Sequence, residues 1–195
     1  MYESKPYKLL SVKQQTHDNY VFRIKCNLNP MPGQFVEVNI PGVGEAPISN
    51  ASYQKNVLEL SVRIVGNVTY AMSKLKKGDT IMLRGPYGNG FPMHYFKGNN
   101  VILVGGGCGT APMKGVIEYL DTNRNDFKDI IIFFGYRSNK DVLFKHHLKH
   151  WEEKFVYNMS IDSEDEGNPL GCYNGFVTKL VEDYTMDNKD KVVLM

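Results

Sequence analysis

The sequence has little of what several large classes of protein need. Its three cysteines, Cys26, Cys108 and Cys172, are scattered and odd in number, which argues against a disulfide framework and indicates a reducing compartment. A formal net charge of only +2 favours neither nucleic acid nor an anionic membrane as an obligatory partner. No apolar run approaches the about 20 residues of a membrane-spanning helix, and residues 1–7 are polar, unlike a signal peptide. We therefore expect a cytoplasmic protein with no membrane span.

Short strand-like segments fill the first half of the chain. They are rich in β-branched residues, alternate in part between apolar and polar positions, and are separated by turns that contain glycine or proline. Their ranges are 8–15, 20–26, 33–41, 57–65 and 80–86. Strands at this spacing predict an antiparallel barrel or sandwich. Ala71, Met72 and Leu75 share one face of a short helix predicted at 69–76.

The second half has a different sequence pattern, in which apolar strands alternate with helices. Strands are predicted at 100–104, 129–136, 154–161 and 191–195, and helices at 111–123, 141–153 and 176–184. Alternation of helices with unalternating apolar strands is typical of a parallel sheet covered on both faces. Polar and turn-forming residues at 94–99 separate the two patterns. We therefore expect a two-domain protein, in which an antiparallel β-barrel domain at 1–97 is followed by an α/β parallel-sheet domain at 98–195.

Four glycines, Gly105, Gly106, Gly107 and Gly109, follow the strand at 100–104. Glycine costs conformational entropy, so this turn needs a positive φ, a close approach of its backbone to another group, or both. In a parallel sheet, ligands lie beyond the carboxyl ends of the strands, and a helix N-terminus there favours anions. The spacing departs from the dinucleotide fingerprint G-x-G-x-x-G. A bound phosphate and a plain tight connection therefore both stay open.

The first half contains a second candidate anion cradle. Gly66, Val68 and Thr69 stand at the start of the predicted short helix, where backbone N–H groups and a hydroxyl can face a phosphate. Two cradles, one in each domain, predict two nucleotide cofactors that meet at the domain interface.

Six motifs in order carry a family resemblance that covers essentially the whole chain. They are APIS, GxVTxAM, GDxIMLRGPYGNGF, GGGCGTAPM, GYRSxxDVLF and GxVT. In this order they resemble the ferredoxin–NADP reductase superfamily. Within it, the sequence is most similar to the flavin subunits of cytoplasmic hydrogenases (sulfhydrogenase gamma subunits) and of anaerobic sulfite reductase. The resemblance implies that 1–97 is an FAD-binding β-barrel domain and 98–195 an NAD(P)-binding α/β domain.

The resemblance also implies the residues of a flavin site. Ser49, the expected catalytic residue, would place its hydroxyl near the redox-active N5 of the flavin. The other expected flavin-binding residues are Ala46, Pro47, Ile48, Arg63, Val65, Gly66, Val68 and Thr69. Ala46 and Ile48 stand where the family's commonest motif has arginine and tyrosine. Arg63 and Arg84 are therefore candidates to replace the arginine that neutralises the flavin phosphate.

The nicotinamide nucleotide would bind at the glycine turn of the second domain. By resemblance, its floor is formed by Gly106, Gly107, Cys108, Gly109, Thr110 and Pro112. Arg137 would meet its phosphates, and Asp162 together with the turn at 171–178 would close the site. Arg137, Ser138 and Lys140 could accommodate a 2′-phosphate, but Arg137 serves a pyrophosphate equally well, so NADH and NADPH both stay open.

Two further features have competing interpretations. Cys108 lies where a helix N-terminus can lower a thiol pKa, but we favour a small side chain packed beneath the cofactor. His146, His147 and His150 include a metal-capable spacing on a helix, but without an evident third ligand we expect a solvated face and no metal site.

The implied activity is that of an NAD(P)H-oxidising electron-transfer subunit that contains FAD. Hydride would pass from the nicotinamide to the flavin, and electrons would then pass singly to iron–sulfur centres of a partner catalytic subunit. The alternatives are the electron-transfer subunit of dihydroorotate dehydrogenase, and a non-catalytic binding module that kept the fold. Residues 192–195 end the chain on an apolar strand, where the family continues, so we expect truncation at the C-terminus. A [2Fe-2S] cluster would need the cysteines of a longer chain.

Overall fold

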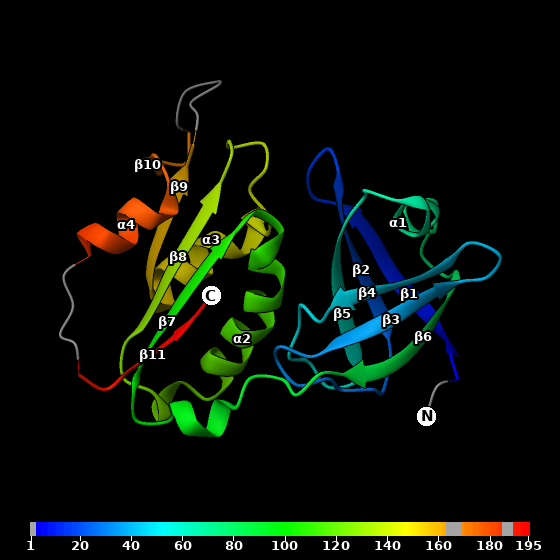
Figure 1. Cartoon of the computed structure of the whole chain (residues 1–195), viewed down its shortest axis with the longest axis horizontal. Helices are drawn as coiled ribbons and strands as arrows, with labels where there is room; N and C mark the ends of the chain where they lie inside the picture. The colour runs from blue at the N-terminus through cyan, green and yellow to red at the C-terminus, as the bar shows by residue number, and fades with distance from the viewer. Residues whose placement is uncertain (1–2, 163–168, 185–188) are drawn as a thin grey trace. The chain divides into compact units, whose positions relative to one another are not determined.

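The computed structural model describes residues 3–162, 169–184 and 189–195 and divides the chain into two compact units (Figure 1). Unit 1 consists of Met1–Phe91 and Ala111–Tyr119, and unit 2 of Pro92–Thr110 and Leu120–Met195. Among the described residues, no helix has the length and apolarity that a membrane crossing requires.

Unit 1 is built on an antiparallel six-stranded sheet that closes into a barrel. Its strands are β1 (Lys5–Gln14), β2 (Asn19–Lys25), β3 (Phe35–Ile40), β4 (Gly44–Ser49), β5 (Val57–Arg63) and β6 (Thr80–Tyr87), in the order β4-β3-β6-β1-β2-β5. The two ends of this order meet just after β4, where Asn50 forms an antiparallel bridge with Leu60 of β5. Next to this bridge, the Ala51 N–H donates to the Glu59 carbonyl at 2.8 Å. The predicted barrel is confirmed.

The barrel interior is filled by the alternating apolar residues of its strands. Phe22, Ile24 and Leu60 are fully buried and belong to one cluster that extends over β1, β2, β3, β5 and β6 and is joined by Met72. Because successive strand residues point to opposite faces, these apolar positions line the interior of the barrel, while the residues between them point outward.

The strand β4 was not among the predicted strands. Its sequence, GEAPIS, contains glycine and proline, which are depleted in strands. It forms because it pairs along its whole length with β3, from Phe35 opposite Ser49 to Ile40 opposite Gly44. Pro47 is tolerated because β4 is the terminal strand of the ladder, where a missing N–H does not interrupt a central pairing.

The first helix, α1 (Asn67–Met72), begins two residues earlier and ends four residues earlier than the helix predicted at 69–76. After Met72 the chain continues in tighter turns, in which the Lys74 N–H donates to Ala71 and the Leu75 N–H to Met72. Such i to i+3 bonds end an α-helix in a tightened last turn. The apolar face that the pattern predicted is real, but its last part is not α-helical.

Unit 2 is built on a parallel five-stranded sheet. Its strands are β7 (Asn100–Gly106), β8 (Ile130–Tyr136), β9 (Val156–Ile161), β10 (Tyr173–Asn174) and β11 (Lys191–Leu194), in the order β10-β9-β8-β7-β11. Its helices are α3 (Leu148–Lys154) and α4 (Val177–Asp183), and α2 (Thr110–Thr122) starts here before it continues in unit 1. Short 3₁₀ turns lie at η1 (Met93–Phe96), η2 (Gly107–Gly109), η3 (Arg124–Asp126) and η4 (Lys145–His147).

Helices cover both faces of β8, which is buried along its whole length. On one face, Ile131 and Phe133 belong to a cluster against which Val177 and Leu180 of α4 pack. On the other face, the ring of Phe134 packs edge-on against Trp151 of α3 at 5.9 Å between centroids. The predicted α/β architecture is confirmed (Figure 1).

The helix predicted at 141–153 was wrong in its first part. Phe144 has a φ of 55°, in the left-handed region that an α-helix cannot contain. The preceding residues Val142 and Leu143 are buried without forming a helix, and only η4 and α3 follow the predicted pattern. Burial of the apolar segment 142–144 therefore overrides its helical periodicity.

Candidate functional site

The glycine turn lies between the end of β7 and the start of α2, and its glycines have different reasons to be there. A Cβ at Gly105 would lie 3.3 Å from the Phe134 ring, so this glycine serves packing. Gly107 has a φ of 51°, which favours glycine. A Cβ at Gly107 or Gly109 would meet no atom within 4 Å, and one at Gly106 would make only an ordinary contact at 3.8 Å. The open space above Gly107 and Gly109 supports the interpretation that a ligand approaches the backbone of this turn.

Thr110 fixes the C-terminal side of this turn. Its side chain is buried, and its hydroxyl donates to the Gly107 carbonyl at 2.8 Å. Pro112, the third residue of α2, is half-buried. Cys108 is exposed and forms no disulfide, so its packing beneath a cofactor stays a prediction.

Three strands end at the edge of the sheet that carries the glycine turn. Arg137 directly follows β8 and is exposed, and Asp162 directly follows β9 and is exposed as well. The Asp162 N–H donates to the Tyr136 carbonyl at 2.9 Å. Because parallel strands present their carboxyl ends at one edge, the structure brings Arg137 and Asp162 to the same edge as the turn at 106–110.

The connection after β8 is held in a compact turn. The Ser138 hydroxyl donates to the Asp141 carboxylate at 2.8 Å, and the Asp141 N–H donates to the Ser138 carbonyl at 3.1 Å. Of the three residues considered for a 2′-phosphate, Ser138 is therefore engaged with a carboxylate.

The predicted closing turn at 171–178 lies next to β9. The Gly175 N–H donates to the Ile161 carbonyl at 2.8 Å, which ties the turn to the end of β9. The side chain of Val177 lies directly over Gly135, where an added Cβ would be 2.8 Å from the Val177 Cβ. Gly135 therefore allows the close approach of α4 to β8. The acidic residues between Asp162 and this turn lie outside the described residues.

In unit 1, the predicted flavin segment is the strand β4. Ala46 and Ile48 are half-buried, and Ile48 packs against the barrel core. Pro47 and Ser49 are exposed. Ser49 thus presents a hydroxyl at the exposed end of the strand, while Ile48 cannot supply the aromatic stacking of the family's usual tyrosine.

The loop before α1 is organised around the Thr69 hydroxyl. This hydroxyl accepts hydrogen bonds from the N–H groups of Val65 and Gly66, each at 3.0 Å, and donates to the Gly66 carbonyl at 3.0 Å. Thr69 itself is buried, whereas Val65 is exposed and a Cβ at Gly66 would meet open space. The geometry makes Thr69 the residue that shapes the loop; direct phosphate contacts by Gly66, Val68 and Thr69 stay predictions.

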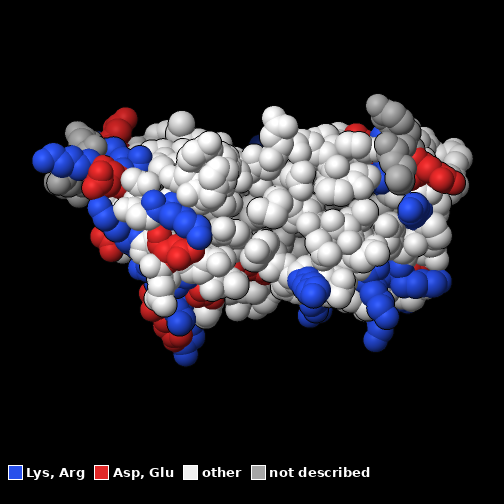
Figure 2. Space-filling model, turned by 90° about the horizontal axis from the view of Figure 1, so that it is seen from below, with Lys and Arg blue, Asp and Glu red and all other residues white. Residues whose placement is uncertain are grey.

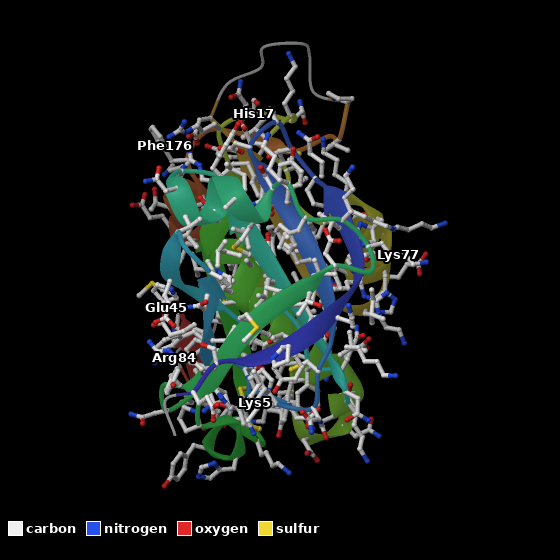
Figure 3. The ribbon with its side chains drawn as sticks, turned by 90° about the vertical axis from the view of Figure 1, so that its right-hand side faces the viewer. Lys5, His17, Glu45, Lys77, Arg84 and Phe176 are labelled. Atoms are coloured by element: carbon white, nitrogen blue, oxygen red, sulfur yellow. The ribbon has the colours of Figure 1, made fainter. Side chains whose placement is uncertain are left out.

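Arg63 and Arg84, the two candidates to neutralise the flavin phosphate, each form an ion pair with a carboxylate. The Nε of Arg63 lies 2.7 Å from Asp18. Arg84 lies 2.7 Å from Glu45 and donates to the Tyr87 hydroxyl at 3.1 Å (Glu45 and Arg84 are labelled in Figure 3). Hydrogen bonds from Arg84, and then from Asn39, hold the pKa of the Glu45 carboxyl below its usual range. A flavin phosphate would compete with these carboxylates for either guanidinium group.

The charge of unit 1 favours anionic ligands. Unit 1 contains 12 Lys and Arg against 7 Asp and Glu, although the whole chain is only +2. On the face shown in Figure 2, the barrel on the right carries Lys and Arg side chains along its lower edge. A local positive excess attracts phosphate-bearing cofactors at long range.

The histidines of the second unit have structural partners. The His150 Nε2 lies 2.9 Å from Asp121, and His147 stacks on the Trp151 ring at 5.6 Å. Within the described part of the chain, no group of three His, Cys, Asp or Glu side chains could hold a metal ion.

Sequence reasoning missed two buried polar residues. Tyr136 ends β8 beneath the glycine turn, and its hydroxyl lies 3.3 Å from Thr110 Oγ1. Lys114 of α2 is 1% exposed and pairs with Glu59 at 2.9 Å and Glu118 at 2.6 Å. The i, i+4 spacing of Lys114 and Glu118 was readable, but nothing local indicated that Lys114 is buried.

Comparison with known proteins agrees with this geometry. Residues 6–91 match the oxidoreductase FAD-binding domain family, and residues 103–195 match the oxidoreductase NAD-binding domain family. The sulfhydrogenase 2 gamma subunit of Pyrococcus furiosus is 39% identical over 96% of this chain and 72% of its own length. A probable dihydroorotate dehydrogenase B (NAD⁺) electron transfer subunit of the same organism is 35% identical over 74% of this chain and 52% of its own length.

The fold is shared with a solved ferredoxin NADP⁺ reductase from Neisseria gonorrhoeae that has bound FAD and NADP. The two chains superpose with a TM-score of 0.82 at 19% identity, over 99% of this chain and 85% of the other. This chain spans about half to three quarters of the length of the curated relatives described above. The chain shares the fold of this reductase, and it belongs to the family of FAD- and NAD-binding oxidoreductases that includes the sulfhydrogenase 2 gamma subunit.

Proposed function

We propose that this chain is an NAD(P)H-oxidising flavin subunit that passes electrons to a partner catalytic subunit of the hydrogenase or sulfite reductase type. The observation that carries the proposal is the open space above Gly107 and Gly109 at an edge where three parallel strands end. Such an edge with a helix N-terminus suits a dinucleotide pyrophosphate. The similarity to a sulfhydrogenase gamma subunit supports the type of partner.

The two cofactors would be held by different parts of the chain. The loop at 65–69 would hold the FAD pyrophosphate with its backbone N–H groups, and β4 would line the flavin ring. The turn at 106–110, with Arg137 and Asp162 beside it, would hold the nicotinamide nucleotide. The family matches at 6–91 and 103–195 support a domain boundary at 97 and 98.

The cofactors supply the redox chemistry: reduced nicotinamide is a hydride donor, and a flavin can accept two electrons together and release them one at a time. The protein supplies position and electrostatics. Ser49 would donate a hydrogen bond to the flavin ring from the exposed end of β4. Thr69 would keep the phosphate loop in shape, and Thr110 would do the same for the glycine turn.

The test is the visible spectrum of the purified full-length chain. We expect a yellow protein that contains FAD and is bleached under anaerobic conditions by NADH or NADPH. A colourless protein that takes up no added FAD would instead support a non-catalytic module. FMN as the sole flavin released on denaturation would contradict the assignment of the loop at 65–69 to a pyrophosphate.

A second candidate partner follows from the 35% identity to a dihydroorotate dehydrogenase electron transfer subunit. Both candidates use the same flavin chemistry, so the subunit that copurifies with this chain distinguishes them. An iron–sulfur subunit of a hydrogenase or sulfite reductase supports the first, and a dihydroorotate-oxidising subunit supports the second.

A further inference from the structure

Tyr136 is buried at the carboxyl end of β8, with only 2% of its surface exposed. Its hydroxyl lies at hydrogen-bond distance, 3.3 Å, from Thr110 Oγ1, and the Thr110 hydroxyl donates to the Gly107 carbonyl at 2.8 Å. We propose that Tyr136 is a positioning residue that sets the shape of the glycine turn for the phosphates of a nicotinamide nucleotide. This inference rests on the proposed function.

Tyr136 also forms hydrogen bonds with the connections that follow β8, its own strand, and β9. The phenol oxygen of Tyr136 accepts a hydrogen bond from the backbone N–H of Leu143, in the connection after β8. The backbone carbonyl of Tyr136 accepts the N–H of Asp162, directly after β9, at 2.9 Å. Tyr136 therefore contacts the segments after β7, β8 and β9, and these segments hold the expected nucleotide-binding residues.

The phenol group is needed in its neutral form, as a donor to Thr110 and an acceptor from Leu143. Burial raises the pKa of the Tyr136 phenol well above its ordinary value, and its hydrogen bonds with Thr110 and Leu143 oppose this only in part. The group thus keeps its proton throughout the physiological pH range. A phenylalanine would fill the same space but would leave the buried Leu143 N–H without this acceptor, and unmade buried hydrogen bonds are costly.

Tyr136 acts through other residues rather than on the ligand. Its side chain is enclosed, while the open space lies above Gly107 and Gly109. Loss of the hydroxyl frees Thr110 to rotate away from the Gly107 carbonyl. The N–H groups of the turn would then lose their fixed direction, and pre-organised donors bind an anion better than mobile ones.

The test compares Tyr136→Phe with Tyr157→Phe in the full-length, FAD-containing protein. Tyr157 is a matched control, because it is a half-buried tyrosine of the same unit whose hydroxyl donates to Met159 Sδ at 3.5 Å and not to the glycine turn. Calorimetric titration with NAD⁺ and with NADP⁺ measures binding without turnover. We expect the Kd of the better ligand to rise about tenfold in Tyr136→Phe, which corresponds to about 1.4 kcal/mol, and to stay within about twofold in Tyr157→Phe.

Kinetics separate positioning from a general loss of structure. For Tyr136→Phe we expect a raised KM for the nicotinamide donor, a kcat close to that of the wild type, and unchanged FAD content and reduction by dithionite. An unchanged Kd in Tyr136→Phe overturns the proposal, whether or not the melting temperature falls. If the wild type binds FAD but neither NAD⁺ nor NADP⁺, the proposed function fails together with the inference.

A second variant tests the same chain of hydrogen bonds, from Tyr136 through Thr110 to Gly107, at Thr110. Thr110→Val removes the hydroxyl at nearly constant volume, and we expect it to raise the Kd at least as much as Tyr136→Phe. In the double variant the two effects should not add, because both changes break one chain of hydrogen bonds. Full additivity would show that Tyr136 does not act through Thr110. If Tyr136→Phe does not fold, Thr110→Val alone decides: an unchanged Kd overturns the proposal.

Discussion

Lys114 provides the sharpest prediction about stability. Its ammonium group is enclosed within unit 1, where it pairs with Glu59 and Glu118 and donates to the Ala51 carbonyl at 3.2 Å. Lys114→Met keeps the length and most of the apolar stem of the side chain, so it removes the charge without leaving a large cavity. The variant leaves two carboxylates with little solvent around them and without their shared cation.

The expected cost follows from the burial of the partners. Removing one member of a buried ion pair costs about 3–5 kcal/mol. The side chains of Glu59 and Glu118 are 10% and 20% exposed, and Arg23 remains 3.6 Å from Glu59. We therefore expect the low end, about 3 kcal/mol. With a urea m-value of about 2 kcal/mol/M, this loss lowers the unfolding midpoint by about 1.5 M.

The assay is urea unfolding followed by far-ultraviolet circular dichroism, with Lys149→Met as control. Lys149 has the same i, i+4 relation to Glu153 that Lys114 has to Glu118, but it is 90% exposed and 4.0 Å from its partner. Its loss should change stability by less than about 0.5 kcal/mol. Adding Glu118→Gln to Lys114→Met should restore part of the loss, because it removes one uncompensated charge. Equal midpoints for the wild type and Lys114→Met would show that the buried ion pairs of Lys114 do not stabilise unit 1.

Three further predictions concern the two cradles and the β4 strand. Gly107→Val places a branched side chain at a φ of 51° in the open turn. The stopped-flow rate of flavin reduction by NADH or NADPH should therefore fall sharply, while dithionite still bleaches the flavin. Equal losses with both kinds of reductant would contradict the nucleotide assignment. Thr69→Ala removes the acceptor of two loop N–H groups, so FAD retention after dialysis should fall more than the melting temperature does, and full retention would count against the loop assignment. Arg84 lowers the pKa of Glu45 from its ordinary 4.5, so the pair stabilises the fold above that value, and this contribution is lost as the pH falls through the lowered pKa. Glu45→Gln should therefore reduce the melting temperature at pH 7 and not at pH 2. An equal loss at both pH values would disprove the electrostatic origin.

Much of the architecture was readable from the sequence because its signals are periodic. The fully apolar run of β8 predicts a strand buried on both faces, and α4 and α3 cover those faces. The strand β4 was not readable, because pairing with β3 and not the local composition makes GEAPIS extended. The segment at 142–144 shows the opposite case: its apolar pattern predicts a helix, but the segment is buried in a non-helical conformation with Phe144 in the left-handed region.

The residues of the candidate site also separate into those whose position could be predicted from the sequence and those whose position could not. The common position of the glycine turn, Arg137 and Asp162 could be predicted, because the carboxyl ends of parallel strands meet at one edge of the sheet; that these residues bind a nucleotide stays a prediction. Tyr136 and Lys114 could not be predicted, because their roles depend on contacts with residues 26 and 55 positions away in the chain. A buried polar residue has no local signature until its partners are known.

The central claim is that this chain takes electrons from a nicotinamide nucleotide through FAD. Anaerobic titration of the full-length, FAD-loaded protein with NADH and with NADPH, followed by the visible flavin absorbance, tests it most directly. We expect at least one of the two donors to bleach the flavin as completely as dithionite does. A flavin that stays oxidised with both donors but is bleached by dithionite would contradict it.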